Sequence, residues 1–261
     1  MAVAHGSRSP HAAATIEALA DQVRQRAFQR GLAGLPVVTA YLGHAAPSPA
    51  QALGALPPGP VVVLPLLLTA AYHSKTDLPA ALAWPERRPT AVLAAAGRRC
   101  GPGRPDIRYG DPLGPHPLLL TALERRLAEV GVPAGEPGTS VVLAAAGSSD
   151  PQACAAIVGL AAQWSALRGW RDVVPAYASA AGPSPGEAVA ALRDSGARRV
   201  VVASYLLAPG RFAGQVRADS LAAGAAAVSG VLGAAPELAD VVLSRYRTAL
   251  GRRPAAAARI A

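Results

Sequence analysis

The feature that most limits the folds open to this chain of 261 residues is an internal duplication. Short patterns recur in both halves in the same order, which is the signature of a repeated structural unit. They pair Gly6-Ser7 and Pro10 with Gly147-Ser148 and Pro151, Tyr41 and Pro47-Ser48-Pro49 with Tyr177 and Pro183-Ser184-Pro185, Val61-Val62-Val63 with Val200-Val201-Val202, and Leu113-Gly114 and Pro117 with Leu232-Gly233 and Pro236. Two units of about 130 residues could each bury a core. The duplication therefore predicts two similar lobes, residues 1–131 and 139–261, joined by a Pro/Gly-containing connector.

Apolar runs rich in β-branched residues alternate with Ala/Leu-rich stretches along both halves, the pattern of parallel β/α units. The expected strands are 2–4, 36–42, 61–68 and 106–109 in the first half and 140–145, 172–176, 199–207 and 226–228 in the second. Expected helices include 10–30, 117–130, 151–167 and 236–250. The predicted fold class is α/β, with two Rossmann-like lobes, each a four-stranded parallel sheet flanked by helices. The Arg/Pro/Gly-rich segment 84–105 has no counterpart and is expected to be a surface insertion.

Composition narrows the partners and the compartment. The net charge of +9 favours an anionic partner, with genome composition as the alternative explanation. There is no basic tail and there are only two phenylalanines, which argues against nucleic acid. The longest apolar run, 61–72, is too short to span a membrane, and the start lacks an export signal. Cys100 and Cys154 lie outside any CxxC spacing, so we expect a cytoplasmic protein without disulfides or a thiolate metal site.

All five histidines lie in the first half, and the second half has replaced every one of them. His5 aligns with Ala146, His11 with Gln152, His44 with Ala180, His73 with Phe212 and His116 with Ala235. Histidines that only supported the fold would be expected to persist at one or two of these places. We therefore expect the first lobe to hold the chemistry and the second to supply a wall.

Four of these histidines follow the carboxyl ends of predicted strands, the edge where open α/β sheets bind ligands. With a strand order of 2-1-3-4, His5 and His73 converge on one crevice. Imidazole suits late first-row divalent metals and is mostly neutral at pH 7. His5 and His73 are therefore the predicted metal-handling residues, and His44 is a further candidate. A helix cap explains His116 equally well, and a first-turn role explains His11 better than function does.

Around these positions the sequence resembles the CbiX/SirB family, the sirohydrochlorin cobaltochelatases and ferrochelatases, over nearly its whole length. The matching patterns are Ala4-His5-Gly6-Ser7-Arg8, Tyr41-Leu42 leading to Pro47-Ser48, Val63-Leu64-Pro65-Leu66-Leu67-Leu68, His73-Ser74-Lys75-Thr76-Asp77-Leu78-Pro79 and Leu113-Gly114-Pro115-His116-Pro117. The resemblance implies a two-lobed Rossmann-like fold with metal-binding histidines at His5 and His73. It implies insertion of a divalent metal substrate, Co2+ or Fe2+ with Ni2+ also open, into sirohydrochlorin, in cobalamin or siroheme biosynthesis and without an organic cofactor.

The chain departs from the family pattern after Leu42, where many relatives carry a glutamate and this sequence has Gly43 and then His44. His44 either replaces that carboxylate as a ligand or proton acceptor, or the function is missing. Arg8 and Lys75 are expected to bind carboxylates of the tetrapyrrole through charge-assisted hydrogen bonds, the alternative being solvated loop charges.

Two other classes of function stay open. A non-catalytic carrier of metal or tetrapyrrole would use the same histidines without turnover. A hydrolase or phosphate-binding enzyme would use Gly6-Ser7 at a helix N-terminus as an anion site. Both a monomer and a homodimer are compatible with the duplication, because one chain already contains two lobes.

Overall fold

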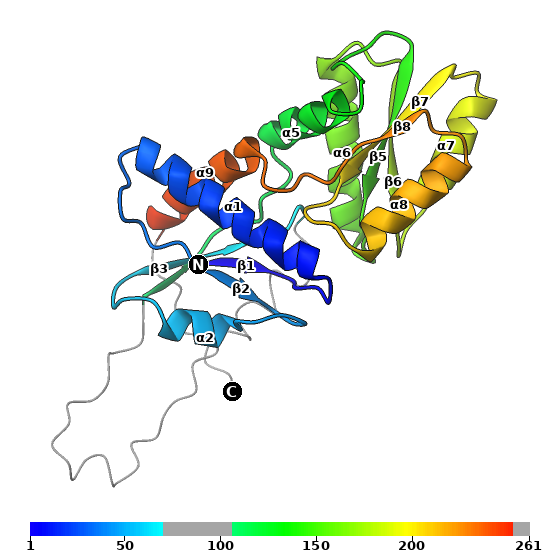
Figure 1. The fold of residues 1–261 in the computed structure, drawn as a ribbon. Helices are drawn as coiled ribbons and strands as arrows, with labels where there is room; N and C mark the ends of the chain where they lie inside the picture. The colour runs from blue at the N-terminus through cyan, green and yellow to red at the C-terminus, as the bar shows by residue number, and fades with distance from the viewer. Residues whose placement is uncertain (70–105, 253–261) are drawn as a thin grey trace, which may run out of the picture.

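The computed structural model describes residues 1–69 and 106–252, which form two α/β lobes with one parallel four-stranded sheet each (Figure 1). This confirms the predicted fold class. The first sheet has the order β2-β1-β3-β4 and the second the order β6-β5-β7-β8. The strands are β1 (Ala2–Ala4), β2 (Thr39–Tyr41), β3 (Val61–Pro65), β4 (Ile107–Tyr109), β5 (Thr139–Ala145), β6 (Asp172–Tyr177), β7 (Arg199–Tyr205) and β8 (Ala227–Val228). The predicted strands 36–42, 61–68 and 199–207 are shorter in the structure. Residues 66–68 and 206–207, which directly follow β3 and β7, line a cleft.

Proline marks the start of most helices in the described part of the chain. The helices are α1 (Pro10–Gln29), α2 (Pro49–Gly54), α5 (Pro117–Ala128), α6 (Pro151–Leu167), α7 (Pro185–Asp194), α8 (Arg211–Ala222) and α9 (Pro236–Leu250). A proline at the first helical position lacks the N–H that a helix start would leave without a partner. Ser48 and Ser184 add matching capping boxes at α2 and α7. These local signals explain why the predicted starts at residues 10, 117, 151 and 236 are confirmed.

Alternating side chains on the strands divide each lobe into an outer and an inner layer. On β5, Val141 and Leu143 face the inner core, whereas Val142 and Ala144 face the outer core with α7 and α8. Helix α2 covers the outer face of the first sheet in the same way, through Leu53. Each sheet therefore has apolar side chains on both faces, as parallel sheets require.

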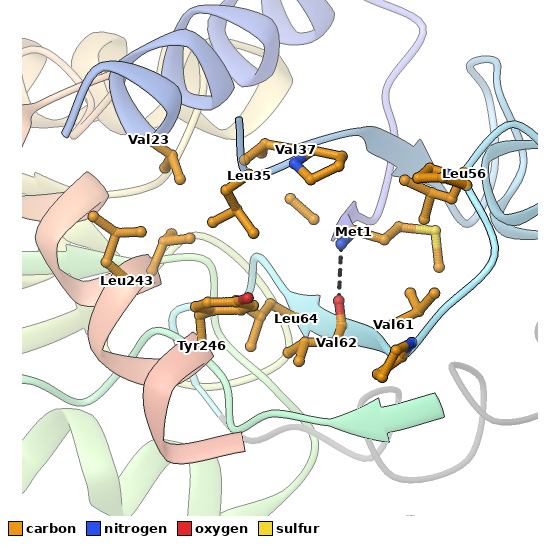
Figure 2. Close-up of a pocket in the computed structure, with 15 residues that line it drawn as sticks. Met1, Val23, Leu35, Val37, Leu56, Val61, Val62, Leu64, Leu243 and Tyr246 are labelled. Carbon is orange, nitrogen blue, oxygen red and sulfur yellow. Dashed lines mark hydrogen bonds between the residues drawn. The ribbon is translucent and has the colours of Figure 1, made fainter. Parts of the chain in front are cut away.

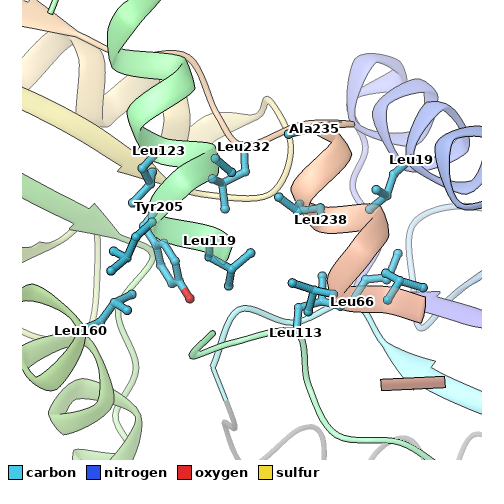
Figure 3. Packing of buried hydrophobic residues seen from close by; sticks show 14 of the residues in the cluster. Leu19, Leu66, Leu113, Leu119, Leu123, Leu160, Tyr205, Leu232, Ala235 and Leu238 are labelled. Carbon is cyan, nitrogen blue, oxygen red and sulfur yellow. The ribbon is translucent and has the colours of Figure 1, made fainter. Parts of the chain in front are cut away.

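The inner faces of the two sheets are covered by exchanged helices. Helix α5 follows β4 in the chain but packs against β7, and α9 follows β8 but packs against α1, β3 and β4 (Figure 1). The two exchanged helices also contact each other. Figure 3 shows the result: Leu119 and Leu123 of α5 lie near Leu160 and Tyr205, and Leu238 of α9 lies near α1. The described parts of the two chain halves, residues 1–69 with 106–131 and residues 139–252, thus share one continuous hydrophobic core.

Charged side chains fix the exchanged helices at the edges of this core. Glu237 of α9, only 8% exposed, receives hydrogen bonds from Arg125 of α5. Glu124 of α5, 9% exposed, accepts from Trp164 Nε1 at 2.9 Å and from Arg168 Nε at 2.8 Å. These carboxylates are buried with their hydrogen-bond partners in place, so they orient the helices without leaving a charge unpaired.

Within residues 1–69 and 106–252, every helix falls short of the length and apolar character needed to cross a bilayer.

Replacing Arg125 with Ala should lower the stability most at neutral pH. Burial alone would raise the pKa of Glu237, but the hydrogen bond from Arg125, a backbone hydrogen bond and the charges of Arg125 and Arg26 together outweigh burial and hold this pKa below the ordinary 4.5. The stabilisation is therefore complete above pH 4.5 and is lost as the pH falls through the lowered folded-state pKa. Urea unfolding of Arg125→Ala should show a loss of about 1 kcal/mol at pH 7, because Arg125 is half-exposed.

That loss should shrink as the pH falls from 4.5 through the lowered pKa of Glu237, because the carboxylate then becomes protonated in both proteins. Arg198→Ala is the matched control, since Arg198 is exposed and has no hydrogen-bond or ion-pair partner in the structure as described. A difference in stability between Arg125→Ala and the parent protein that stays constant from pH 7 to pH 3.5 would contradict the role given to this pair.

Candidate active site

A cavity of about 560 Å³ opens between the carboxyl ends of the strands of both lobes. This volume falls in the range of small-molecule sites, and the location is the one that parallel sheets favour for ligands. The first lobe contributes residues 5–7 after β1, Leu42 after β2 and residues 66–69 after β3, with Ala12, Ala13 and Ile16 of α1. The second lobe contributes residues 146–148 after β5, residues 206–210 after β7 and residues 211–213 of α8, with Ala153, Cys154 and Ile157 of α6.

His5 directly follows strand β1 and has an exposed side chain that lines this cleft, as predicted for a residue at the carboxyl end of a strand. The backbone continues the sheet pairing past the strand: Leu42 N donates to Ala4 O and Gly43 N donates to His5 O, each at 3.0 Å. His5 is therefore held on a paired backbone. It is the one imidazole among the described residues that line the cleft.

The other residues predicted for the site do not join His5 in the described cleft lining. His44 and Arg8 are exposed and lie outside the set of residues that line the cleft. The imidazole of His116 caps α5, because its Nδ1 accepts from Leu118 N at 3.2 Å, which confirms the capping interpretation. Burial, with a contribution from the nearby Arg245, lowers the pKa of His116. His73 and Lys75, like the insertion 84–105, lie outside the described residues.

The loop after β2 has the same backbone conformation as its counterpart after β6 in the second lobe. His44 has φ 60° and its counterpart Ala180 has φ 59°, and each is followed by a cis proline at Pro47 or Pro183. An alanine adopts the left-handed conformation as well as the histidine does. The unusual backbone of His44 is therefore a property of the duplicated loop and does not depend on the imidazole.

A second pair of matched positions, Gly6 and Gly147, allows two neighbouring loops of each lobe to approach closely. Gly6 has φ 91°, and a Cβ atom there would lie 1.7 Å from Gly43 O. Gly147 has φ 88°, and its Cβ would lie 1.8 Å from Ser179 O. Only glycine accommodates both the positive φ and the close carbonyl. The glycine after His5 is thus required for the contact between the β1 and β2 loops.

The hydroxyl groups next to these glycines have local partners. Ser7 Oγ accepts from Ser9 N at 3.1 Å, and Ser148 Oγ accepts from Asp150 N at 3.0 Å. The same bond in both lobes is a turn-stabilising interaction before a helix. The hydroxyl of Ser7 therefore stabilises a turn, as that of Ser148 does, and this shared pattern does not indicate a nucleophile.

Sequence reasoning missed Tyr205, which links the two walls of the cleft. Tyr205 ends β7 in the second lobe, is 1% exposed, and donates from its hydroxyl to Leu68 O in the first lobe at 3.0 Å. Burial raises the pKa of this phenol far above its ordinary value, so it stays protonated as a donor. In the register of the duplication Tyr205 aligns with Leu66, and this change from an apolar to a polar residue was the available signal.

Arg211 and Phe212, at the start of α8, were missed as well. Arg211 is the single charged side chain among the described residues lining the cleft, whose other members are mostly apolar. Phe212 lines the same wall and is 39% exposed. The alignment of Phe212 with His73 marked this position, but only as one where the second lobe had lost a histidine.

A smaller cavity of about 100 Å³ lies at the opposite edge of the first sheet, against α9 (Figure 2). Apolar residues such as Val23, Leu64 and Leu243 form most of its wall, and the Met1 amino group there donates to Val62 O at 2.8 Å. It lies at the amino ends of the strands and has no histidine, so the larger cleft is the candidate active site. Among the residues described, no three His, Cys, Asp or Glu side chains are grouped as they would be around a metal ion.

Comparisons with known proteins point to one family. The CbiX family model matches residues 1–130 and again 140–249. A sirohydrochlorin ferrochelatase of Bacillus subtilis is 27% identical over 161 residues, which are 61% of this chain and 55% of the relative. A sirohydrochlorin cobaltochelatase of Priestia megaterium is 28% identical over 152 residues, 58% of this chain and 45% of the relative. The alignments therefore span about half the length of these relatives.

A solved structure extends the similarity to both lobes. SirB from Bacillus subtilis with Fe3+ superposes with a TM-score of 0.74 and 25% identity, covering 96% of this chain and 94% of that one. The double match of the family model and this coverage agree with the duplication found in the strand order and loop geometry.

Replacing Gly6 with Ala should be far more costly than the same change at Gly31. Both glycines have positive φ, so both substitutions carry a backbone strain of about 1 kcal/mol, but nothing lies within 4 Å of a Cβ at Gly31. The clash with Gly43 O should add about 2 kcal/mol or more at Gly6. Thermal and urea unfolding of the two variants measure the difference, and equal losses would show that the close approach of the two loops is not needed.

Proposed function

Because the chain belongs to the CbiX family, we propose that it inserts a divalent metal into sirohydrochlorin in the cleft between its lobes. The observation that carries the proposal is the position of His5, an imidazole at a strand end facing a cavity of about 560 Å³. In this proposal the lobe of residues 1–131 holds the metal, and the lobe of residues 139–261 forms the opposite wall.

The shape and lining of the cleft suit a flat macrocycle. Aliphatic side chains enter the cleft from both lobes, among them Ile16, Leu66, Ile157 and Leu207. Transfer of the apolar faces of a tetrapyrrole from water to these walls is favourable by about 25 cal/mol per Å² of apolar surface. The continuous core beneath keeps the walls in place, so binding does not have to order them first.

His73 is the proposed second ligand of the metal, as the family resemblance implies. Leu68 and Thr69 line the cleft together with His5, and His73 follows four positions after Thr69 in the sequence. An extended chain of that length reaches about 14 Å, so connectivity permits both imidazoles to face the cleft. Two imidazoles with water leave coordination positions open for pyrrole nitrogens, whereas a closed four-ligand site would retain the ion.

Metal insertion also requires acceptors for the two pyrrole N–H protons. A neutral imidazole, with an unperturbed pKa of about 6.5, can accept a proton near pH 7. His5 lies in the cleft wall, and its ring nitrogen would be free to accept one of these protons once the ion has passed from it to the pyrrole nitrogens. His44 stays a prediction as a proton acceptor or ligand, and Arg8 and Lys75 stay predictions as ligands of the substrate carboxylates.

The identity of the metal is the finer part of the proposal. The curated relatives include two proteins named ferrochelatases and one named a cobaltochelatase. Imidazole ligands accept Fe2+, Co2+ and Ni2+ alike, so we propose that supply of metal decides between Co2+ and Fe2+. Initial rates with each of the three ions, measured under anaerobic conditions, would rank them.

Replacing either proposed metal histidine should reduce metal insertion at least about tenfold, the cost of losing one ligand from a two-imidazole site. His5→Ala and His73→Ala are compared with the parent protein by the absorbance change of sirohydrochlorin on addition of Co2+. His11→Ala is the matched control, because His11 lies on the first turn of α1 outside the cleft lining. Full activity in His5→Ala, with Co2+ and with Fe2+, would overturn the assignment.

The same assay separates the alternatives. A carrier would leave the absorbance change at its uncatalysed rate while still binding metal in equilibrium dialysis. A hydrolase or phosphate-binding enzyme that used Gly6-Ser7 would keep its activity in His73→Ala.

A further inference from the structure

Arg211 and Phe212 are exposed residues that line the cleft from the lobe opposite His5. Both residues belong to the first turn of α8, which follows β7 and the cleft-lining residues 206–210. The second half of the chain has no histidine, so the role of these two residues concerns the substrate and not the metal. The inference drawn below rests on the proposed function.

Arg211 differs from the arginines that support the fold. Arg125, Arg168 and Arg199 each pair with a carboxylate at the core edge. Arg211 has no hydrogen-bond or ion-pair partner in the structure as described, and its neighbours in the cleft wall, Pro209 and Ala213, carry no charge. A guanidinium without a protein partner in a mostly apolar wall has all its donors available for an anionic ligand, and its fork geometry fits a carboxylate with two parallel hydrogen bonds.

Phe212 adds an apolar surface beside this charge. It is one of two phenylalanines in the chain and keeps 39% of its surface exposed although it lines the cleft. The exposed part of this ring is a surface that a planar conjugated ligand can cover by offset stacking. In the register of the duplication, Phe212 occupies the position of His73.

We propose that Arg211 and Phe212 form the substrate-positioning edge of the second lobe. Arg211 binds a peripheral carboxylate of the tetrapyrrole, and the ring of Phe212 packs against the macrocycle beside that carboxylate. The ligand class is thus a polycarboxylated planar macrocycle, held from the lobe opposite the metal-binding histidine. Duplication has separated two tasks, metal binding by the first copy and macrocycle orientation by the second.

The first experiment measures binding without catalysis. Uroporphyrin, a porphyrin with carboxylates on every pyrrole ring, is titrated into the metal-free protein and followed by quenching of its fluorescence. Loss of a charge-assisted hydrogen bond should weaken binding by Arg211→Ala about tenfold, and Arg211→Lys should recover part of that loss. Raising the salt concentration should weaken binding less in Arg211→Ala than in the parent protein, because one ionic contact is gone.

Arg198→Ala is the matched control for charge. Arg198 precedes β7 at the opposite end of the strand from Arg211, is exposed, and is not part of the cleft lining. Its removal lowers the net charge equally but should change uroporphyrin affinity less than about twofold. Equal weakening in both variants would overturn the proposal and leave only a general effect of net charge.

Phe212 is tested against the other phenylalanine. Phe212→Ala should weaken uroporphyrin binding about fivefold, the loss expected for one aromatic contact, with Phe212→Leu in between. Phe28→Ala, at a ring that is 72% exposed on α1 outside the cleft lining, should have no effect. Unchanged affinity in Phe212→Ala would remove the ring from the proposal.

The kinetic readout distinguishes positioning from folding. With sirohydrochlorin and Co2+, Arg211→Ala should raise KM for the tetrapyrrole about tenfold and leave kcat and the KM for Co2+ within about twofold. An unchanged KM for sirohydrochlorin together with unchanged uroporphyrin affinity would overturn the role of Arg211. If the parent protein binds uroporphyrin but inserts no metal, the proposed function fails, while the binding titrations still decide the role of Arg211.

Discussion

The rest of the structure depends on the exchange of α5 and α9 between the two sheets. Each sheet has an inner apolar face that its own chain half covers only in part, with α1 in the first lobe and α6 in the second. The remaining surface is covered by a helix from the other half, so the two inner layers merge into one core. Hydrophobic burial of this kind is not directional, and the buried carboxylates of Glu124 and Glu237 supply the orientation that apolar contacts lack. A cleft between lobes joined in this way has walls fixed by the same core.

Because of the duplication, the two walls of the cleft have the same backbone conformation and differ in their side chains. The glycine turns at Gly6 and Gly147, and the left-handed residues His44 and Ala180, have nearly equal φ values. Because the backbone repeats so closely, the difference between the walls lies in side chains at matched positions. His5 faces the cleft from the first lobe where the second has Ala146. The asymmetry of the site therefore arises without any change of fold.

Local signals made much of the fold predictable from the sequence. Three signals were enough to predict the order of the elements, the order of the strands in each sheet and the position of His5 beyond the carboxyl end of a strand. These signals were proline at the helix starts, the alternation of β-branched runs and the repeated patterns. The helix exchange was not predictable, because an amphipathic pattern shows which face of α9 is apolar but not which sheet it meets. Tyr205 and Arg211 escaped for the same reason, since their importance comes from the opposite lobe. Segment 70–105, with His73 and Lys75, lies outside the described residues, so those two roles stay predictions.

The hydrogen bond from Tyr205 to Leu68 O has a consequence for how a macrocycle meets a metal in such a cleft. It joins the end of β7, which leads to Arg211, to the end of β3, which leads toward His73. Both segments line the cleft, so this contact directly connects the wall proposed to hold the tetrapyrrole with the wall proposed to hold the ion, in addition to the shared core beneath them. Insertion needs the ion and the pyrrole nitrogens within bonding distance, and small errors of position are costly in such steps. A link between walls that is 1% exposed, away from competing water, is suited to keep that spacing constant while substrate and product exchange.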